Sequence, residues 1–145
     1  MKKILIATHG HLASGFESAA RILAGDSVDI QHIDAYTEDE PGDYTPKIEA
    51  FVSSISDGDQ GVIFTDILAG SVNQKVCQVL AAMGDRPNVF LVTGTNLMAV
   101  LAVVLEFRPI SAEVLKELVS QTAVEVVELS APKNEEVVDE DAFLS

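Results

Sequence analysis

Three short stretches of this sequence are almost continuously apolar, and they constrain the fold more than any other feature. They are KILIAT (residues 3–8), GVIFT (61–65) and NVFLVT (88–93). A strand with one exposed face alternates apolar and polar residues, whereas a continuous apolar run indicates a strand that is buried on both faces. Strands of this kind belong to parallel sheets that helices cover on both sides. The three runs therefore predict an α/β fold.

The segments between these runs have the apolar spacing of amphipathic helices. Thr45 before Pro46 and Ser71 with Gln74 are typical helix-start patterns, the second being a capping box. Strands that alternate with helices form right-handed βαβ units, which predicts an open, mostly parallel sheet with helices on both faces. We expect helices over 12–23, 46–55 and 71–83 and after the capping residues Asn96 and Ser111. Further strands are expected over 28–35 and at Val124 to Leu129 (VEVVEL).

The length of the chain predicts the number of domains, and its net charge argues against some classes of binding partner. The chain has 145 residues, which predicts one domain over 1–130 followed by an acidic C-terminal tail over 131–145. Its net charge of −14 argues against binding to nucleic acid or to an anionic membrane surface. The apolar run at residues 4–7 is too short for a secretory signal, so we expect a cytoplasmic protein. The single cysteine, Cys77, is expected to be a buried small residue of a helix.

Chemistry-bearing residues lie where the predicted strands end. The carboxyl ends of parallel strands meet at one edge of the sheet, where ligands of such folds bind. His9 ends the first apolar run and Asp66 follows the second. A neutral imidazole is a nucleophile, and a carboxylate bound to one ring nitrogen leaves the other nitrogen free to react. We favour these catalytic roles over the alternatives, a His9 that merely ends the strand and an Asp66 that caps the next helix.

Gly10, Gly70 and Ser71 are the residues we expect to surround a bound phosphoryl group. Gly10 lets the backbone approach a ligand closely, and the helix that follows it presents N-terminal amides to the same place. Gly70 and Ser71 open another helix and offer amides and a hydroxyl group. A role for Ser71 as a pure helix cap explains its position equally well.

A metal site is the alternative interpretation of the H-x-H pair that His9 forms with His11. Asp34 and Asp66 are the available further ligands, but no cluster of cysteine or histidine supports a site, and we expect no metal. His32 lies within a strand pattern, which indicates a structural role. The sequence also lacks the glycine-rich nucleotide-binding motifs and the G-x-S-x-G nucleophile motif, so we expect no cofactor.

Three segments resemble the enzyme IIA components of the mannose/fructose/sorbose family of the bacterial sugar phosphotransferase system (PTS). The start ILIATHGHLASGFESAARILAG is similar to the N-terminus of that family, VIFTDILAGSVNQ to its second motif, and VFLVTGTNLMAVLAVVLE to its third. They occur in the family's order over residues 1–130. Some members have a threonine and an aromatic residue directly after the aspartate, where this chain has Ile67 and Leu68.

The resemblance implies a phosphocarrier of sugar uptake that works without a cofactor. The family's histidine accepts a phosphoryl group from HPr and passes it to the IIB component, which acts with the membrane components IIC and IID. His9 matches this histidine, Asp66 the aspartate that orients it, and Ser71 the helix-starting serine. The family exchanges its last strand across a homodimer, and Val124 to Leu129 would be that strand, antiparallel to the rest. The sugar itself is not readable from these residues.

Other functions also fit a strand-end histidine in this fold. The phosphotransfer subunit of a PTS-dependent dihydroxyacetone kinase usually continues His-Ser, where this chain has His9 and Gly10. A non-enzymatic regulatory domain of the same fold would not need both His9 and Asp66. A metal-dependent hydrolase would use His9 with His11. We therefore favour the transport phosphocarrier.

Overall fold

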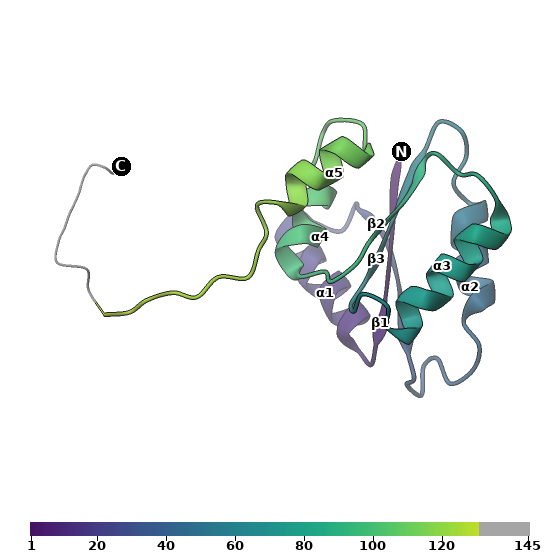
Figure 1. The fold of residues 1–145 in the computed structure, drawn as a ribbon, viewed down its shortest axis with the longest axis horizontal. Coiled ribbons are helices and arrows are strands. Elements are labelled where there is room, and N and C mark those ends of the chain that lie inside the picture. The colour runs from purple at the N-terminus through teal and green to yellow at the C-terminus, as the bar shows by residue number, and fades with distance from the viewer. Residues whose placement is uncertain (131–145) are drawn as a thin grey trace.

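The three apolar runs and the strand predicted over 28–35 form one parallel sheet with the strand order β2-β1-β3-β4 (Figure 1). The computed structural model describes residues 1–130. The predicted parallel α/β fold is confirmed. Its strands are β1 Lys2–His9, β2 Asp29–Ala35, β3 Gln60–Thr65 and β4 Val89–Val92, and its helices are α1 Leu12–Ala24, α2 Thr45–Ser53, α3 Ser71–Met83, α4 Leu97–Val104 and α5 Ala112–Val119.

Both faces of β1 are covered, as its continuous apolar run requires. Ile4 and Ile6 pack in a core with residues of α1, α4 and α5, whereas Leu5 and Ala7 pack in a second core with residues of α2 and α3. Figure 1 shows these two groups of helices on opposite sides of the sheet. All four side chains are at most 2% exposed. His9 is therefore attached to the end of a strand that packing holds from both sides.

Two helix starts differ from the sequence prediction. Gly70 is the N-cap of α3 and Ser71 is its first residue, so no capping box with Gln74 forms; the Gln74 side chain donates to the carbonyl of Ala69 instead. Thr45 is likewise the first residue of α2, and its hydroxyl donates to the carboxylate of Asp43. A glycine cap with no side-chain bond leaves the Ser71 hydroxyl available for other contacts.

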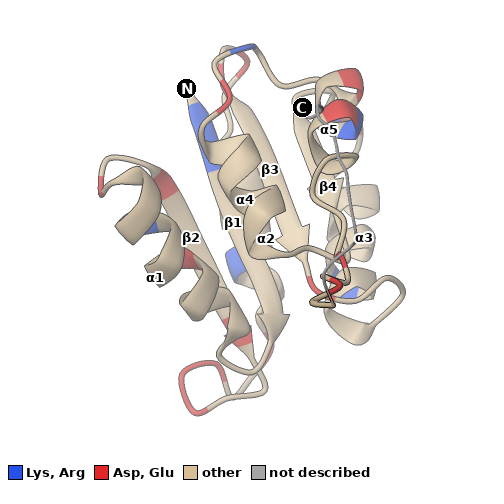
Figure 2. Ribbon diagram, turned by 90° about the vertical axis from the view of Figure 1, so that its left-hand side faces the viewer, with Lys and Arg blue, Asp and Glu red and all other residues tan. Residues whose placement is uncertain are grey.

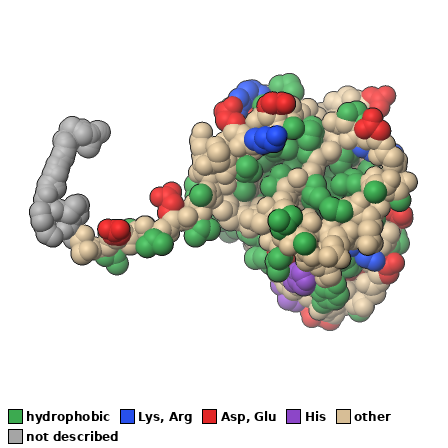
Figure 3. All heavy atoms as spheres, viewed as in Figure 1, with side chains coloured by type: hydrophobic (Ala, Val, Ile, Leu, Met, Phe, Trp, Pro, Cys, Tyr) green, Lys and Arg blue, Asp and Glu red, His purple; other side chains and the backbone are tan. Residues whose placement is uncertain are grey.

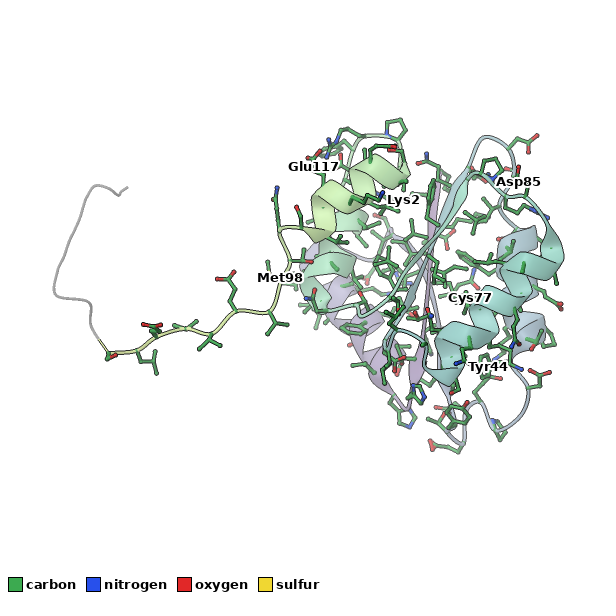
Figure 4. The ribbon with its side chains drawn as sticks, in the orientation of Figure 1. Lys2, Tyr44, Cys77, Asp85, Met98 and Glu117 are labelled. Carbon is green, nitrogen blue, oxygen red and sulfur yellow. The ribbon has the colours of Figure 1, made fainter. Side chains whose placement is uncertain are left out.

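Cys77 also differs from its prediction. It lies on α3 (Figure 4), but its side chain is exposed in the described chain rather than buried. Its neighbours Val76 and Val79 occupy the buried face of the helix, which places the intervening positions outward. A single apolar face on α3 therefore excludes Cys77 from the core.

The segment Val124 to Leu129 forms no strand within the described part of the chain. It extends away from the sheet (Figure 1), and Val124, Val126 and Leu129 are each about nine-tenths exposed. The strand β4 pairs with β3 on one side only, so its other edge carries unpaired backbone groups. Exchange of this segment between two chains stays a prediction, and the expected acidic tail at 131–145 lies outside the described residues.

Candidate functional site

His9 and Asp66 meet at the carboxyl edge of the sheet because β1 and β3 are adjacent parallel strands. The backbone amide of His9 donates to Oδ2 of Asp66 at 2.9 Å, and Nδ1 of the His9 ring lies 3.0 Å from the same oxygen. The other carboxylate oxygen accepts the amide of Ile67 at 3.1 Å. Both oxygens of Asp66 are thus engaged, and within residues 1–130 neither bonds to an amide of α3. The alternative of Asp66 as the cap of that helix does not describe this geometry.

The protonation of this pair follows from its contacts. Burial favours the neutral acid, but the hydrogen bonds from the backbone and ring of His9 outweigh it and lower the pKa of Asp66 below its ordinary value. An ionised carboxylate only accepts hydrogen bonds, so Nδ1 of His9 is the donor. The neutral ring then has its lone pair on Nε2. The His9 side chain is 40% exposed, which makes this nitrogen accessible to a reaction partner.

Ser71 and Tyr36 surround that second nitrogen. The hydroxyl oxygen of Ser71 lies 3.3 Å from Nε2 of His9, and the hydroxyl of Tyr36 lies 2.7 Å from that of Ser71. The rings of Tyr36 and His9 are 5.4 Å apart between centroids and tilted by 34°. Sequence reasoning missed Tyr36, although it directly follows β2 and thus reaches the same edge of the sheet. Its position after a strand was the available signal.

The two glycines expected at the site have different reasons for being glycine. Gly10 has φ +60°, a left-handed conformation that suits glycine, and its amide donates to the carbonyl of Ala35 at 2.9 Å. A Cβ added at Gly70 would lie 3.2 Å from both Cβ and the carbonyl oxygen of Ile67. Gly10 therefore allows the turn after His9, and Gly70 allows the loop after Asp66 to pack tightly against the start of α3.

At the start of α1, one of the first-turn amides expected to face a ligand at His9 is already engaged by another group. The amide of Ser14 donates to Oδ1 of the buried Asp34 at 2.9 Å. The N-terminus of α3 is the one that lies beside the imidazole, through Ser71, and it has no side-chain cap among the described residues. Helix N-termini favour anions, so α3 is the better placed of the two to receive a phosphoryl group.

His11 belongs to a separate acidic cluster beside the site. Its Nδ1 lies 3.1 Å from Oδ2 of Asp34 and 3.9 Å from Oδ2 of Asp39, and its Nε2 lies 3.2 Å from Oε2 of Glu38. Figure 2 shows acidic residues in the loop after β2, and in Figure 3 histidine side chains gather at one end of the domain. The hydrogen bond to Asp34, followed by the charges of the neighbouring carboxylates, raises the pKa of His11.

This cluster is the one group of described residues whose ligand atoms are close enough to share a metal ion. Atoms of His11, Asp34 and Asp39 lie within 4.8 Å of one another. Asp66, the other candidate ligand, is engaged with His9 instead. The carboxylate of Asp34 already accepts the amide of Ser14 and a hydrogen bond from His11. Ion pairs and hydrogen bonds account for the cluster, and it gives no reason to assign a metal.

The rim of the site is open and apolar. Ile67, Leu68 and Tyr36 are 55%, 72% and 64% exposed. Ile67 and Leu68 occupy the positions where some members of the enzyme IIA family described above have a threonine and an aromatic residue. Neither side chain can donate a hydrogen bond to a phosphoryl group. An accessible imidazole with apolar residues in the neighbouring loop suits a macromolecular reaction partner better than a small ligand, which binds in an enclosed pocket. No helix of the described chain is long and apolar enough to cross a membrane.

Comparison with known proteins gives the following matches. The family model for the PTS system fructose IIA component, EIIA-man, matches residues 3–121. A protein assigned to a phosphoenolpyruvate-dependent sugar PTS permease of Klebsiella pneumoniae is 27% identical with a TM-score of 0.70, over 83% of this chain and 85% of that one. No curated protein sequence shows a significant match.

Two further solved structures share the fold. The mannose/sorbose-specific IIA subunit of Enterococcus faecalis is 23% identical with a TM-score of 0.69, over 90% of this chain and 98% of that one. The PTS IIA protein associated with the fucose utilization operon of Streptococcus pneumoniae is 21% identical with a TM-score of 0.65, over 86% and 92% of the two chains.

Proposed function

Since the chain belongs to the mannose-type enzyme IIA family of the PTS, we propose that it accepts a phosphoryl group from HPr on His9 and passes it to a IIB component. Family membership gives the chain a phosphotransfer role in a sugar PTS. The finer assignment is supported by one observation above all: Nδ1 of His9 is held by the ionised Asp66 at 3.0 Å, while Nε2 is left accessible. This is the arrangement that a nucleophilic imidazole requires.

In the proposed transfer, the lone pair on Nε2 of His9 forms a bond with phosphorus. The bond between phosphorus and the donor atom breaks, and its electron pair stays with the donor. The proton on Nδ1 stays between His9 and Asp66, whose negative charge offsets the positive charge that develops on the ring. Ser71 and the N-terminal amides of α3 stabilise the phosphoryl oxygens. The protein contributes positioning and charge stabilisation, which is the usual content of phosphoryl-transfer catalysis.

The partners in this proposal are proteins. HPr is the donor, IIB is the acceptor, and the membrane components IIC and IID are reached only through IIB, so we place the protein in the cytoplasm. The net charge of −14 favours encounters with partners that carry a basic patch. The exposed apolar side chains of Ile67 and Leu68, in the loop that follows Asp66, suit a protein interface. The functional unit in this proposal is the domain over 1–130.

Phosphorylation with purified PTS proteins tests the assignment of His9. With enzyme I, HPr and phosphoenolpyruvate, the chain is expected to gain one phosphate that is labile in acid and stable in base. His9→Ala is expected to abolish this label, because His9 is the histidine that Asp66 holds by Nδ1 beside Ser71 and the N-terminus of α3. His11→Ala serves as the matched control and keeps the label. Loss of the label in His11→Ala alone, or its persistence in His9→Ala, would show that His9 is the wrong nucleophile.

The proposed homodimer depends on the segment Val124 to Leu129 and the open edge of β4. A groove of about 330 Å³ beside that edge is lined by apolar side chains of β4 and α5, such as Leu91 and Val119. Apolar side chains of a second chain that pairs with β4 would be removed from water there. Light scattering is expected to show a dimer for the full chain and a monomer for a chain that ends at residue 123. A full-length monomer at micromolar concentration contradicts the exchange.

A further inference from the structure

The conformation of Tyr36 is not explained by the packing of the core. Its φ is +65°, a left-handed value that residues with a Cβ adopt at an energetic cost, and its side chain is 64% exposed. Burial of the ring therefore contributes little to holding this backbone. Two of its contacts lie at the site: the ring rests 5.4 Å from that of His9, and the hydroxyl reaches Ser71. Burial raises the pKa of Tyr44, and Tyr36 also lies close enough to that hydroxyl to raise it further.

The direction of each hydrogen bond in this group follows from its neighbours. The ring proton of His9 is on Nδ1, because the carboxylate there can only accept, so Nε2 is an acceptor. The hydroxyl of Ser71, 3.3 Å away, is then the donor to Nε2. Its oxygen is left to accept from the hydroxyl of Tyr36 at 2.7 Å. The order Tyr36 to Ser71 to His9 is thus a chain of donors aimed at the reactive nitrogen.

We propose that Tyr36 is a positioning residue for the phosphoryl transfer at His9, and that it acts through Ser71. A serine hydroxyl rotates freely unless a second partner restrains it. By donating to the oxygen of Ser71, Tyr36 keeps the serine proton on the side of Nε2, where the phosphoryl oxygens arrive. Once Nε2 has bonded to phosphorus, it has no lone pair, and the same serine proton is available to a phosphoryl oxygen. This inference rests on the proposed function, because it assigns a role in that transfer.

A different role for Tyr36 makes different predictions. An exposed aromatic side chain beside a nucleophile also suits direct contact with the donor protein. In that case its removal affects transfer from HPr but not from a small donor. Phosphoramidate, which transfers phosphate to histidine without a protein surface, therefore separates positioning from docking.

The experiment compares Tyr36→Phe, Ser71→Ala and the double variant, with HPr and with phosphoramidate as donors. Loss of one neutral hydrogen bond corresponds to a rate decrease of about three- to tenfold. Tyr36→Phe is expected to slow both reactions by this factor and to cause no further decrease in the Ser71→Ala background. Ser120→Ala removes an exposed hydroxyl that bonds only within α5 and its cap, and is expected to behave as wild type.

Nitrogen NMR of the unphosphorylated His9 ring provides a readout that does not depend on phosphate transfer. The Nε2 resonance is expected to move in Tyr36→Phe toward its value in Ser71→Ala, because both variants weaken the hydrogen bond to this atom. An unchanged Nε2 resonance, an effect confined to HPr, or additive effects of the two substitutions would each overturn the proposal. If wild type itself takes no phosphate on His9, the proposed function fails, while the NMR comparison still decides whether Tyr36 acts through Ser71.

Discussion

His9 and His11 are two residues apart at the same edge of the sheet, and they differ in what meets the second ring nitrogen. Each has Nδ1 within 3.1 Å of an aspartate oxygen. Nε2 of His9 faces the hydroxyl of Ser71, which can donate a hydrogen bond to a lone pair. Nε2 of His11 instead lies 3.2 Å from a carboxylate oxygen of Glu38, which can only accept.

This difference separates the histidine that we propose as the nucleophile from one that forms ion pairs. An imidazole between two carboxylates is stabilised with a proton on both nitrogens, and the pKa of His11 is accordingly raised, first by its hydrogen bond to Asp34 and also by Glu38. A fully protonated ring has no lone pair with which to attack phosphorus. A neighbouring aspartate therefore does not by itself identify a reactive histidine; the group at the other nitrogen decides.

The largest effect is expected from Asp66→Asn, which disrupts the His9 pair. The amide can present its NH₂ to Nδ1 and so favour the tautomer whose Nε2 carries the proton. The analogous substitution in Ser-His-Asp enzymes costs up to about four orders of magnitude in rate. The substitution also removes the repulsion between the Asp66 charge and the incoming phosphoryl group, which favours transfer by only roughly 1 kcal/mol, under a factor of ten. The variant is expected to take phosphate from HPr at least tenfold more slowly.

The position of the phosphate checks the same interpretation. In wild type, nitrogen NMR of the phosphorylated ring is expected to show phosphorus on Nε2 of His9, since Nδ1 is engaged by Asp66. Phosphate on Nδ1, or a variant as fast as wild type, would mean that Asp66 does not orient the imidazole.

A smaller effect, on stability rather than transfer, is expected from Asp34→Ala at the other pair. The carboxylate of Asp34 is buried and accepts the amide of Ser14 in the first turn of α1. Loss of a cap-like bond of this kind costs about 1–2 kcal/mol, which corresponds to a decrease in melting temperature of about 3–6 °C. The exposed Asp39→Ala is the matched control and is expected to change the melting temperature by less than about 1 °C. A tenfold loss of phosphorylation in Asp34→Ala would show that the pair of His11 and Asp34 is not independent of the pair of His9 and Asp66.

The smallest effect concerns pH. A histidine with a raised pKa in the folded protein stabilises it fully below the pKa of the unfolded chain, near 6.5. That contribution is lost as the pH rises through the higher folded value. Chemical denaturation of wild type from pH 6 to 9 is therefore expected to show a decrease in stability that His11→Gln lacks. The same pH dependence in both proteins would show that the contacts of His11 with Asp34 and Glu38 do not hold in solution.

The sequence was sufficient to predict the parallel α/β architecture and one part of the site, the contact between His9 and Asp66. Continuous apolar runs identify strands buried on both faces, and the ends of β1 and β3 converge whatever their loops do, so the contact between His9 and Asp66 was expected. The contacts of Tyr36 and His11 were not. The contacts of both residues depend on the path of the loop after β2. The residues of that loop do not predict that Tyr36 adopts a φ of +65°.

The helix starts show a second limit. Ser71 satisfies the usual pattern of an N-cap, but Gly70 takes that place and Ser71 turns its hydroxyl to His9. Local propensity shows that a residue is able to cap a helix, but it does not show which of two neighbouring residues is the N-cap. Cys77 was misplaced for a related reason, because a small apolar residue is compatible with either side of an amphipathic helix.

The placement of His9 on β1 also has a consequence for local unfolding. The strand pairs with β2 on one side and β3 on the other, so its amides are expected to exchange with solvent only on global unfolding. Tyr36 begins a loop in which Glu38, Asp39 and Asp43 are exposed, and we expect this loop to open more readily than the sheet. We therefore expect His9 to be held in place by the stability of the whole domain, and Tyr36 to depend on the stability of a single loop.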